Sequence, residues 1–174
     1  MNGFYGECLR LEIFGQSHAA SIGMTLEGVP AGARVDLDAL VRFMQRRAPG
    51  RGEYTTARRE ADVPEFTSGL RNGVTDGTSI TAVIRNTDAR PRDYDALRTV
   101  PRPGHADYSA WLRYGSIPTG GGEFSGRMTA PLCVAGGICL QLLENEGVSI
   151  SARIAEIGGA CDEKEMRDKI MQAK

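Results

Sequence analysis

Residues 8–14 have the sequence Cys-Leu-Arg-Leu-Glu-Ile-Phe, and this stretch sets the beginning of the fold. Leu9, Leu11 and Ile13 occupy alternate positions, which is typical of a β-strand with one buried face. The motif Gly15-Gln16-Ser17-His18 follows directly. We therefore expect its histidine in a turn just beyond the end of the strand.

The remaining periodic stretches predict one α+β unit that covers residues 1–174. Apolar residues at helical spacing follow Asp36, an expected N-cap, and predict a helix that stops near residues 48–50. The other expected elements are a short strand near residues 23–26, a β-hairpin of strands 62–70 and 79–86 that turns at Asp76-Gly77, a long ordered loop over 86–116 with a short helix at 108–114, a buried helix over 129–143, a strand over 148–157 and a polar helix over 163–173.

The distribution of positive charge favours a small, multiply anionic ligand. The net charge is −1, which argues against a general binder of polyanions, and all three lysines lie at or after residue 164. The other basic residues are arginines, whose rigid donor fork suits phosphate and carboxylate. A preference for arginine codons in the source genome would explain the number of arginines equally well. A nucleic-acid surface is a further alternative that Glu53 and Glu60 disfavour; it would use Arg46, Arg47, Arg51, Arg58 and Arg59.

Other features of the sequence bear on location and metal binding. No apolar run approaches the roughly 20 residues that cross a bilayer, and the N-terminus lacks the layout of a signal peptide, so a cytoplasmic protein without membrane partners is expected. The four cysteines have no CxxC spacing and none is near a histidine. This predicts no metal site and four reduced, mostly buried thiols.

The chain has two histidines, and each lies in a run suited to charged ligands. His18 follows Ser17, and His105 belongs to Arg102-Pro103-Gly104-His105, where proline and glycine predict a tight turn. Taken singly, a loop histidine is more often a surface or hydrogen-bonding residue than a catalyst. Gly120-Gly121-Gly122, followed by Ser125-Gly126-Arg127 and a helix, is a plausible anion site, although a triple glycine is more often a flexible turn.

Five separated groups of motifs together are far more specific than any one of them. They are Phe14–His18 with Glu27–Gly32, Gln45–Gly50 with Tyr54–Thr56, Ile84–Arg90, Arg102–Tyr108 and Gly120–Gly122. The same motifs occur in this order and spacing in chorismate synthases, so the chain resembles that family from about Gly6 to its last residue. Members of the family are longer, and this chain is similar to their N-terminal half.

The resemblance implies a fold and an activity. The fold would be half of the family's β-α-β sandwich, with an antiparallel sheet packed on helices. The full-length enzyme is a cytoplasmic homotetramer that converts 5-enolpyruvylshikimate 3-phosphate to chorismate and phosphate by 1,4 anti elimination. It requires reduced FMN and catalyses the last step of the shikimate pathway in aromatic amino acid biosynthesis. The chain alone is expected to hold an incomplete FMN pocket and to be inactive; the alternative function is a truncated, non-catalytic chain that folds or self-associates.

The resemblance also implies roles for single residues. His18 would protonate the departing phosphate and His105 would lie against the flavin, which agrees with general acid chemistry. The residues implied to bind the substrate are Ser17, Arg47, Arg102 and Arg127, with Arg51 replacing an arginine that many members carry where this chain has Glu53. The residues implied to contact the flavin are Ser125 together with Glu123 and Phe124, which replace an Arg-Ser pair of many members.

Overall fold

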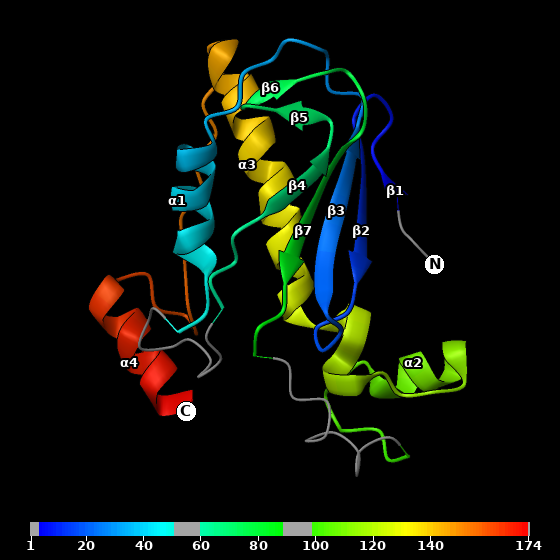
Figure 1. The fold of residues 1–174 in the computed structure, drawn as a ribbon. Coiled ribbons are helices and arrows are strands. Elements are labelled where there is room, and N and C mark those ends of the chain that lie inside the picture. The colour runs from blue at the N-terminus through cyan, green and yellow to red at the C-terminus, as the bar shows by residue number, and fades with distance from the viewer. Residues whose placement is uncertain (1–3, 51–59, 89–98, 174) are drawn as a thin grey trace.

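The computed structural model describes residues 4–50, 60–88 and 99–173. Its main feature is an antiparallel sheet with the strand order β1-β2-β3-β7-β4. α3 packs against β3 and β7 and also against α1, so the two helices lie beside the sheet (Figure 1). The predicted α+β class, with an antiparallel sheet packed on helices, is confirmed. The elements of the sheet and these helices are β1 (Phe4–Tyr5), β2 (Arg10–Gly15), β3 (Ser21–Glu27), β4 (Glu65–Ser68), β7 (Ile80–Arg85), α1 (Leu37–Arg47) and α3 (Thr129–Asn145).

The strand predicted at residues 8–14 is confirmed as β2, which begins at Arg10. β3 is longer than the predicted strand at 23–26 because it is a central strand, paired with β2 on one side and β7 on the other. Its residues Ile22, Met24 and Leu26 are at most 2% exposed and form the middle of the core. The turn between β2 and β3 carries Ser17 and His18, as predicted.

The first helix also agrees with its prediction. The Asp36 side chain caps α1 by accepting a hydrogen bond from the Ala39 amide at 2.9 Å, and the helix ends at Arg47. Leu40 and Met44 are buried against the core. A Cβ atom at Gly137 of α3 would lie 2.5 Å from the Leu40 Cδ1 atom, so this glycine permits the close approach of α1 and α3.

The predicted hairpin is confirmed in its pairing but not in its turn. β4 and β7 pair antiparallel, yet a second, small hairpin of β5 (Leu70–Arg71) and β6 (Val74–Thr75) lies between them. Its turn is Asn72-Gly73, where both residues have positive φ angles of 49° and 74°. That conformation suits the type I′ turn, for which Asn-Gly is a preferred pair. Asp76-Gly77 instead connects β6 to β7, and the Asp76 carboxylate accepts hydrogen bonds from Thr78.

The C-terminal third contains one wrong prediction. The helices predicted at 108–114, 129–143 and 163–173 are confirmed as α2 (Asp107–Tyr114), α3 and α4 (Glu163–Ala173). The strand predicted at 148–157 is not formed, because within the described residues no strand lies beside this segment to pair with it. Its apolar residues Val148, Ile150 and Ile154 are exposed, and the segment makes only a single bridge between Ile157 and Ala160. Residues 89–98 of the predicted loop lie outside the described residues.

The cysteines are free thiols, as predicted, but they are less buried than expected. Cys8 and Cys161 are exposed, whereas Cys133 and Cys139 on α3 are half-buried. Burial raises the pKa of the Cys139 thiol, because the apolar core disfavours the thiolate. Cys8 is out of phase with the alternating Leu9, Leu11 and Ile13, so its exposure could have been predicted, whereas the segment around Cys161 has no apolar periodicity.

The stretch Gly126–Asn145 has the length and the mean hydropathy, 1.3, of a membrane-spanning helix. The expectation that no apolar run approaches this length was therefore wrong. Ala130, Val134 and Ile138 on this stretch are fully buried in the core shared with β3 and β7. Packing in this core accounts for the apolar character of the buried part, which is 39% of an 18-residue window within the stretch.

Candidate active site

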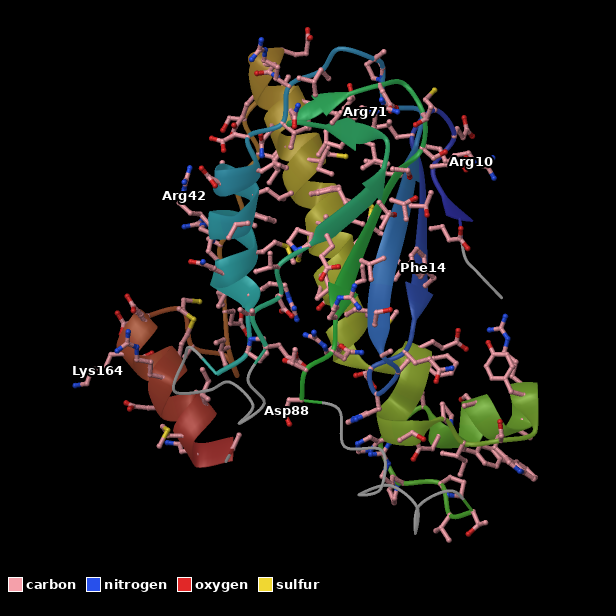
Figure 2. All side chains as sticks on the ribbon, in the orientation of Figure 1. Arg10, Phe14, Arg42, Arg71, Asp88 and Lys164 are labelled. Atoms are coloured by element: carbon pink, nitrogen blue, oxygen red, sulfur yellow. The ribbon has the colours of Figure 1, made fainter. Side chains whose placement is uncertain are left out.

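Four segments meet at one end of the molecule, below the sheet in Figure 1. They are the turn between β2 and β3, the glycine segment that precedes α3, the start of α2 and the residues after β7. Asp88, which follows β7, marks this end in Figure 2, whereas Arg10 and Arg71 lie at the opposite end of the sheet. The motifs that the sequence singled out are therefore gathered at the same end, although more than a hundred residues separate the first from the last.

Ser17 connects the His18 turn to the glycine segment, Gly120–Gly122. Its amide donates a hydrogen bond to the Gly122 carbonyl at 3.2 Å, and its hydroxyl donates to the Gly120 carbonyl at 3.2 Å. All three glycines have positive φ angles, of 60°, 84° and 53°, which a side chain would strain. The triple glycine is thus an ordered bend, and Ser17, which is 1% exposed, packs behind it.

A cavity of about 370 Å³ lies beside this bend. Arginine and histidine side chains, glycine backbone and one aromatic ring form its wall. The lining residues are Arg102, Gly104, His105, Ala106, Asp107, Gly120, Gly121, Phe124, Ser125 and Gly126. His105 Nδ1 lies 3.0 Å from the Pro103 carbonyl oxygen. Because a carbonyl only accepts, Nδ1 is the donor in this contact, and the other ring nitrogen, Nε2, is not used by it.

Arg102 is held against the cavity by a buried carboxylate. Its backbone amide, Nε and Nη2 donate hydrogen bonds to Asp107 at 3.1, 2.7 and 2.9 Å. Asp107 is 1% exposed, and its hydrogen bond with the Arg102 side chain holds the pKa of the carboxyl below its usual value. The positive charge of His105 lowers this pKa further. The carboxylate thus fixes the direction in which the guanidinium points.

A second buried carboxylate, Asp62, holds two of the predicted arginines together. Its Oδ2 accepts from Arg47 Nη1 at 2.5 Å and its Oδ1 accepts from Arg127 Nη1 at 2.6 Å. Arg127 also approaches Glu60, with 3.8 Å between Nη2 and Oε2, and donates from Nε to Asn86 Oδ1 at 2.8 Å. Arg127, Asp62 and Glu60 are at most 7% exposed. Two cations and two anions therefore form a neutral, buried cluster.

The predicted site residues separate into two groups. His105, Arg102, Phe124 and Ser125 line the cavity. Ser17, Arg47 and Arg127 lie behind or beside it in protein hydrogen bonds, and Ser125 Oγ also accepts from the Arg127 amide at 3.3 Å. Arg51 and Glu53 lie outside the described residues.

Glu123, a predicted flavin contact, lies at the edge of this region. It accepts a hydrogen bond from the Tyr114 hydroxyl, which raises the pKa of that tyrosine, and Tyr114 also packs on Phe124 with ring centres 6.3 Å apart. Glu123 and Phe124 therefore connect the glycine segment to α2.

The sequence interpretation missed the partners of the arginines, namely Asp62, Glu60, Asn86 and Asp107. Glu60 was noted only as an acidic residue within a basic run. A usable signal was present for Glu60 and Asp62: acidic residues that lie next to an arginine-rich run are expected to pair with arginine when they are buried. The partner of each one depends on contacts between distant segments, which no local pattern reveals.

Comparisons with known proteins agree with this arrangement. The chorismate synthase family model matches residues 9–174. The chorismate synthase of Lancefieldella parvula is 49% identical over 160 residues, which make up 90% of this chain and 42% of that protein. The chorismate synthase of Chitinophaga pinensis is 39% identical over a match 176 residues long with its gaps, which covers 100% of this chain and 52% of that protein.

The fold comparison gives the same result. A crystal structure of chorismate synthase is similar with a TM-score of 0.65 and 26% identity, covering 91% of this chain and 40% of that one. The chain spans about half the length of the curated relatives it matches. The match to the family model extends over nearly all of its residues, so the chain belongs to the chorismate synthase family.

Proposed function

We propose that the protein that carries this chain converts 5-enolpyruvylshikimate 3-phosphate to chorismate and phosphate by a 1,4 anti elimination that requires reduced FMN. The bond between carbon and the phosphate oxygen breaks, the C6 proton leaves, and a second ring double bond forms. The observation that carries this proposal is the shared position of both histidine motifs on the glycine segment. Ser17 donates a hydrogen bond to Gly120, and His105 lines a cavity together with Gly120 and Gly121.

The residues at the cavity fit the ring system of a flavin. Gly104 and Gly126 have no atom within 4 Å of an added Cβ, so their backbone leaves space for a flat group. Phe124, 40% exposed, offers an apolar face, and His105 offers a nitrogen at its rim. Gly104, His105, Phe124 and Ser125 would hold the group. Reduced FMN, when bound, supplies electron density to the breaking bond between carbon and oxygen.

The chain's own residues would bind and protonate. His18 would donate a proton to the departing phosphate, whose charge rises as the bond breaks. His105 would hold a proton at Nε2 beside the flavin, with Nδ1 fixed by Pro103. Arg102, oriented by Asp107, would bind an anionic group of the substrate at the cavity. Arg47 and Arg127, whose charges are balanced by Asp62 and Glu60, would support the site from behind the cavity. Arg51, a further proposed substrate contact, lies outside the described residues.

The activity is tested with two proteins. One is the chain of residues 1–174; the other is the same chain joined to the part of the Lancefieldella parvula enzyme that follows its matched region. Phosphate release is measured with the substrate and reduced FMN under anaerobic conditions. We expect turnover in the joined protein and none in the chain alone. Absence of turnover in a folded joined protein would contradict the proposed reaction, and turnover by the chain alone would contradict the expected incomplete FMN pocket.

A second candidate function, a non-catalytic chain that self-associates, is favoured by one observation. Tyr108, Trp111 and Leu112 on α2 are 57%, 48% and 63% exposed, an apolar group that monomers seldom display. Such contacts would also serve the cytoplasmic homotetramer that we propose for the complete enzyme. Light scattering of the chain at several concentrations measures this association. A monomer at every concentration would contradict it.

A further inference from the structure

Asn86 is the first residue after β7 and lies beside the turn that carries Ser17 and His18. Its Nδ2 group donates two hydrogen bonds into that turn, to the Ala19 carbonyl at 2.8 Å and to the Gln16 carbonyl at 3.1 Å. Its backbone amide donates to the Ala20 carbonyl at 3.0 Å. Three carbonyls of one short turn thus depend on a residue 66 to 70 positions away in the sequence.

The other end of the Asn86 side chain faces the buried arginine. Oδ1 accepts from Arg127 Nε at 2.8 Å, while Asp62 accepts from Nη1 of the same guanidinium at 2.6 Å. The two acceptors fix the plane of Arg127, which is 7% exposed. Its Nη2 atom is buried without a hydrogen-bond partner among the described residues and has only the longer ion pair with Glu60 Oε2, at 3.8 Å.

An amide is required at this position. The two carbonyls need two donors and the guanidinium needs an acceptor, and the asparagine side chain supplies all three on a short stem. Aspartate has the same shape but no donor, so its second oxygen would face two carbonyl oxygens. The carbonyls would repel it, although the pair with Arg127 would remain.

The His18 turn is therefore clamped from two directions. Ser17 anchors it to Gly120 and Gly122, and Asn86 anchors it to Arg127 and through that residue to Asp62. We propose that Asn86 is a positioning residue that holds the Ser17-His18 turn in register with the buried arginine cluster. Its consequence for catalysis rests on the proposed function, whereas the clamp itself does not.

The clamp is tested by amide hydrogen exchange, measured by NMR on the chain with Asn86→Asp. We expect the Ser17 and Ala19 amides to exchange about tenfold faster, the scale of losing one or two hydrogen bonds. Met24 in the centre of β3 serves as the internal reference and should keep its rate. The matched control is Asn72→Asp, the same chemical change in the exposed turn between β5 and β6, where aspartate tolerates the positive φ.

The two histidines provide an independent signal. Their ring resonances are assigned with His18→Gln and His105→Gln, and Asn86→Asp should shift or broaden the His18 resonance but leave that of His105 in place. Equal changes at both histidines, or an unchanged Ser17 exchange rate, would overturn the proposal. If Asn86→Asp does not fold, Asn86→Ala removes the same hydrogen bonds without adding charge. The Ser17 exchange rate and the changes at the two histidine resonances then test the proposal in that variant.

The catalytic consequence is measured on the joined protein described above. Asn86→Asp should lower kcat about tenfold or more and change KM by less than about twofold, because the turn carries the proton donor and its Ser17 is 1% exposed, with its hydroxyl donated to Gly120. In the background of His18→Ala the same substitution should have little further effect on kcat. An equal loss in both backgrounds would show that Asn86 does not act through His18. If the joined protein without the substitution shows no turnover, the proposed reaction is contradicted but the clamp is not. The amide exchange rates would still test the clamp.

Discussion

Arg102 directs three of its nitrogen atoms at the carboxylate of Asp107, five residues later in the chain. The carboxylate is almost fully buried and accepts from Nε at 2.7 Å and from Nη2 at 2.9 Å, which is the two-point geometry that arginine and carboxylate prefer. One pair therefore sets both the first turn of α2 and the orientation of a cation at the cavity wall.

The pair between Arg102 and Asp107 predicts a specific acid sensitivity. The pKa of Asp107 is lowered in the folded state from its ordinary 3.8, mainly by the hydrogen bond to Arg102. Its contribution to stability is therefore fully present above that ordinary value and is lost as the pH falls through the lower folded pKa. In Asp107→Asn, the free energy of unfolding should be lower at neutral pH and should fall less steeply in acid than in the parent. Urea unfolding at a series of pH values measures this, with Asp168→Asn on exposed α4 as the control. Equal acid slopes in parent and Asp107→Asn would contradict it.

Asp62 is expected to be the most sensitive position in the buried cluster. In Asp62→Asn the backbone conformation at φ 51° is kept, since asparagine tolerates it as well, but two arginines lose their shared charge. Removing the partner of a buried charge costs at most about 3–5 kcal/mol, and the loss here should be smaller because Arg127 keeps the ion pair with Glu60 and Arg47 is partly exposed. Urea unfolding of Glu65→Gln, which breaks an exposed pair with Arg85, provides the comparison and should show a change near the error of the measurement. Similar losses in both variants would mean that burial of the cluster is unimportant.

Two adjacent glycines in α3 should respond in opposite directions to alanine. A Cβ atom at Gly137 would lie 2.5 Å from Leu40 Cδ1 and 3.0 Å from Phe43 Cδ1, and Leu40 is fully buried, so Gly137→Ala should lose about 1–3 kcal/mol of stability. Nothing lies within 4 Å at Gly136. Gly136→Ala should therefore gain about 0.5–1 kcal/mol from helix propensity. Denaturant unfolding separates the two, and a gain in both would disprove the close packing of α1 on α3.

The histidines are expected to matter for turnover and not for folding. His18→Ala or His105→Ala in the active joined protein should lower turnover by about 10²-fold or more, the usual scale for losing a general acid or base. Phosphate release with reduced FMN gives the rates, and circular dichroism checks that each variant folds. Unchanged turnover in both variants would remove the proposed roles.

Local patterns in the sequence predicted most of the elements. The alternation of Leu11 and Ile13 predicted β2, the cap at Asp36 predicted the start of α1, and the polar stretch at 163–173 predicted α4. Side chains of one element decide these features, so a short window contains the information. The turn at Asn72-Gly73 was equally visible but was overlooked in favour of Asp76-Gly77.

The candidate site divides in the same way. Sequence alone identified the motifs, the two histidines and the family, because these depend on residue types in a fixed order. Only the tertiary structure decided that Asp107 orients Arg102, that Asp62 joins Arg47 to Arg127, and that Asn86 holds the His18 turn. The same applies to residues 148–157, where a strand pattern forms no strand without a neighbour. Hydrogen bonds and ion pairs between distant segments depend on how the chain packs, and burial then makes each of them strong and specific.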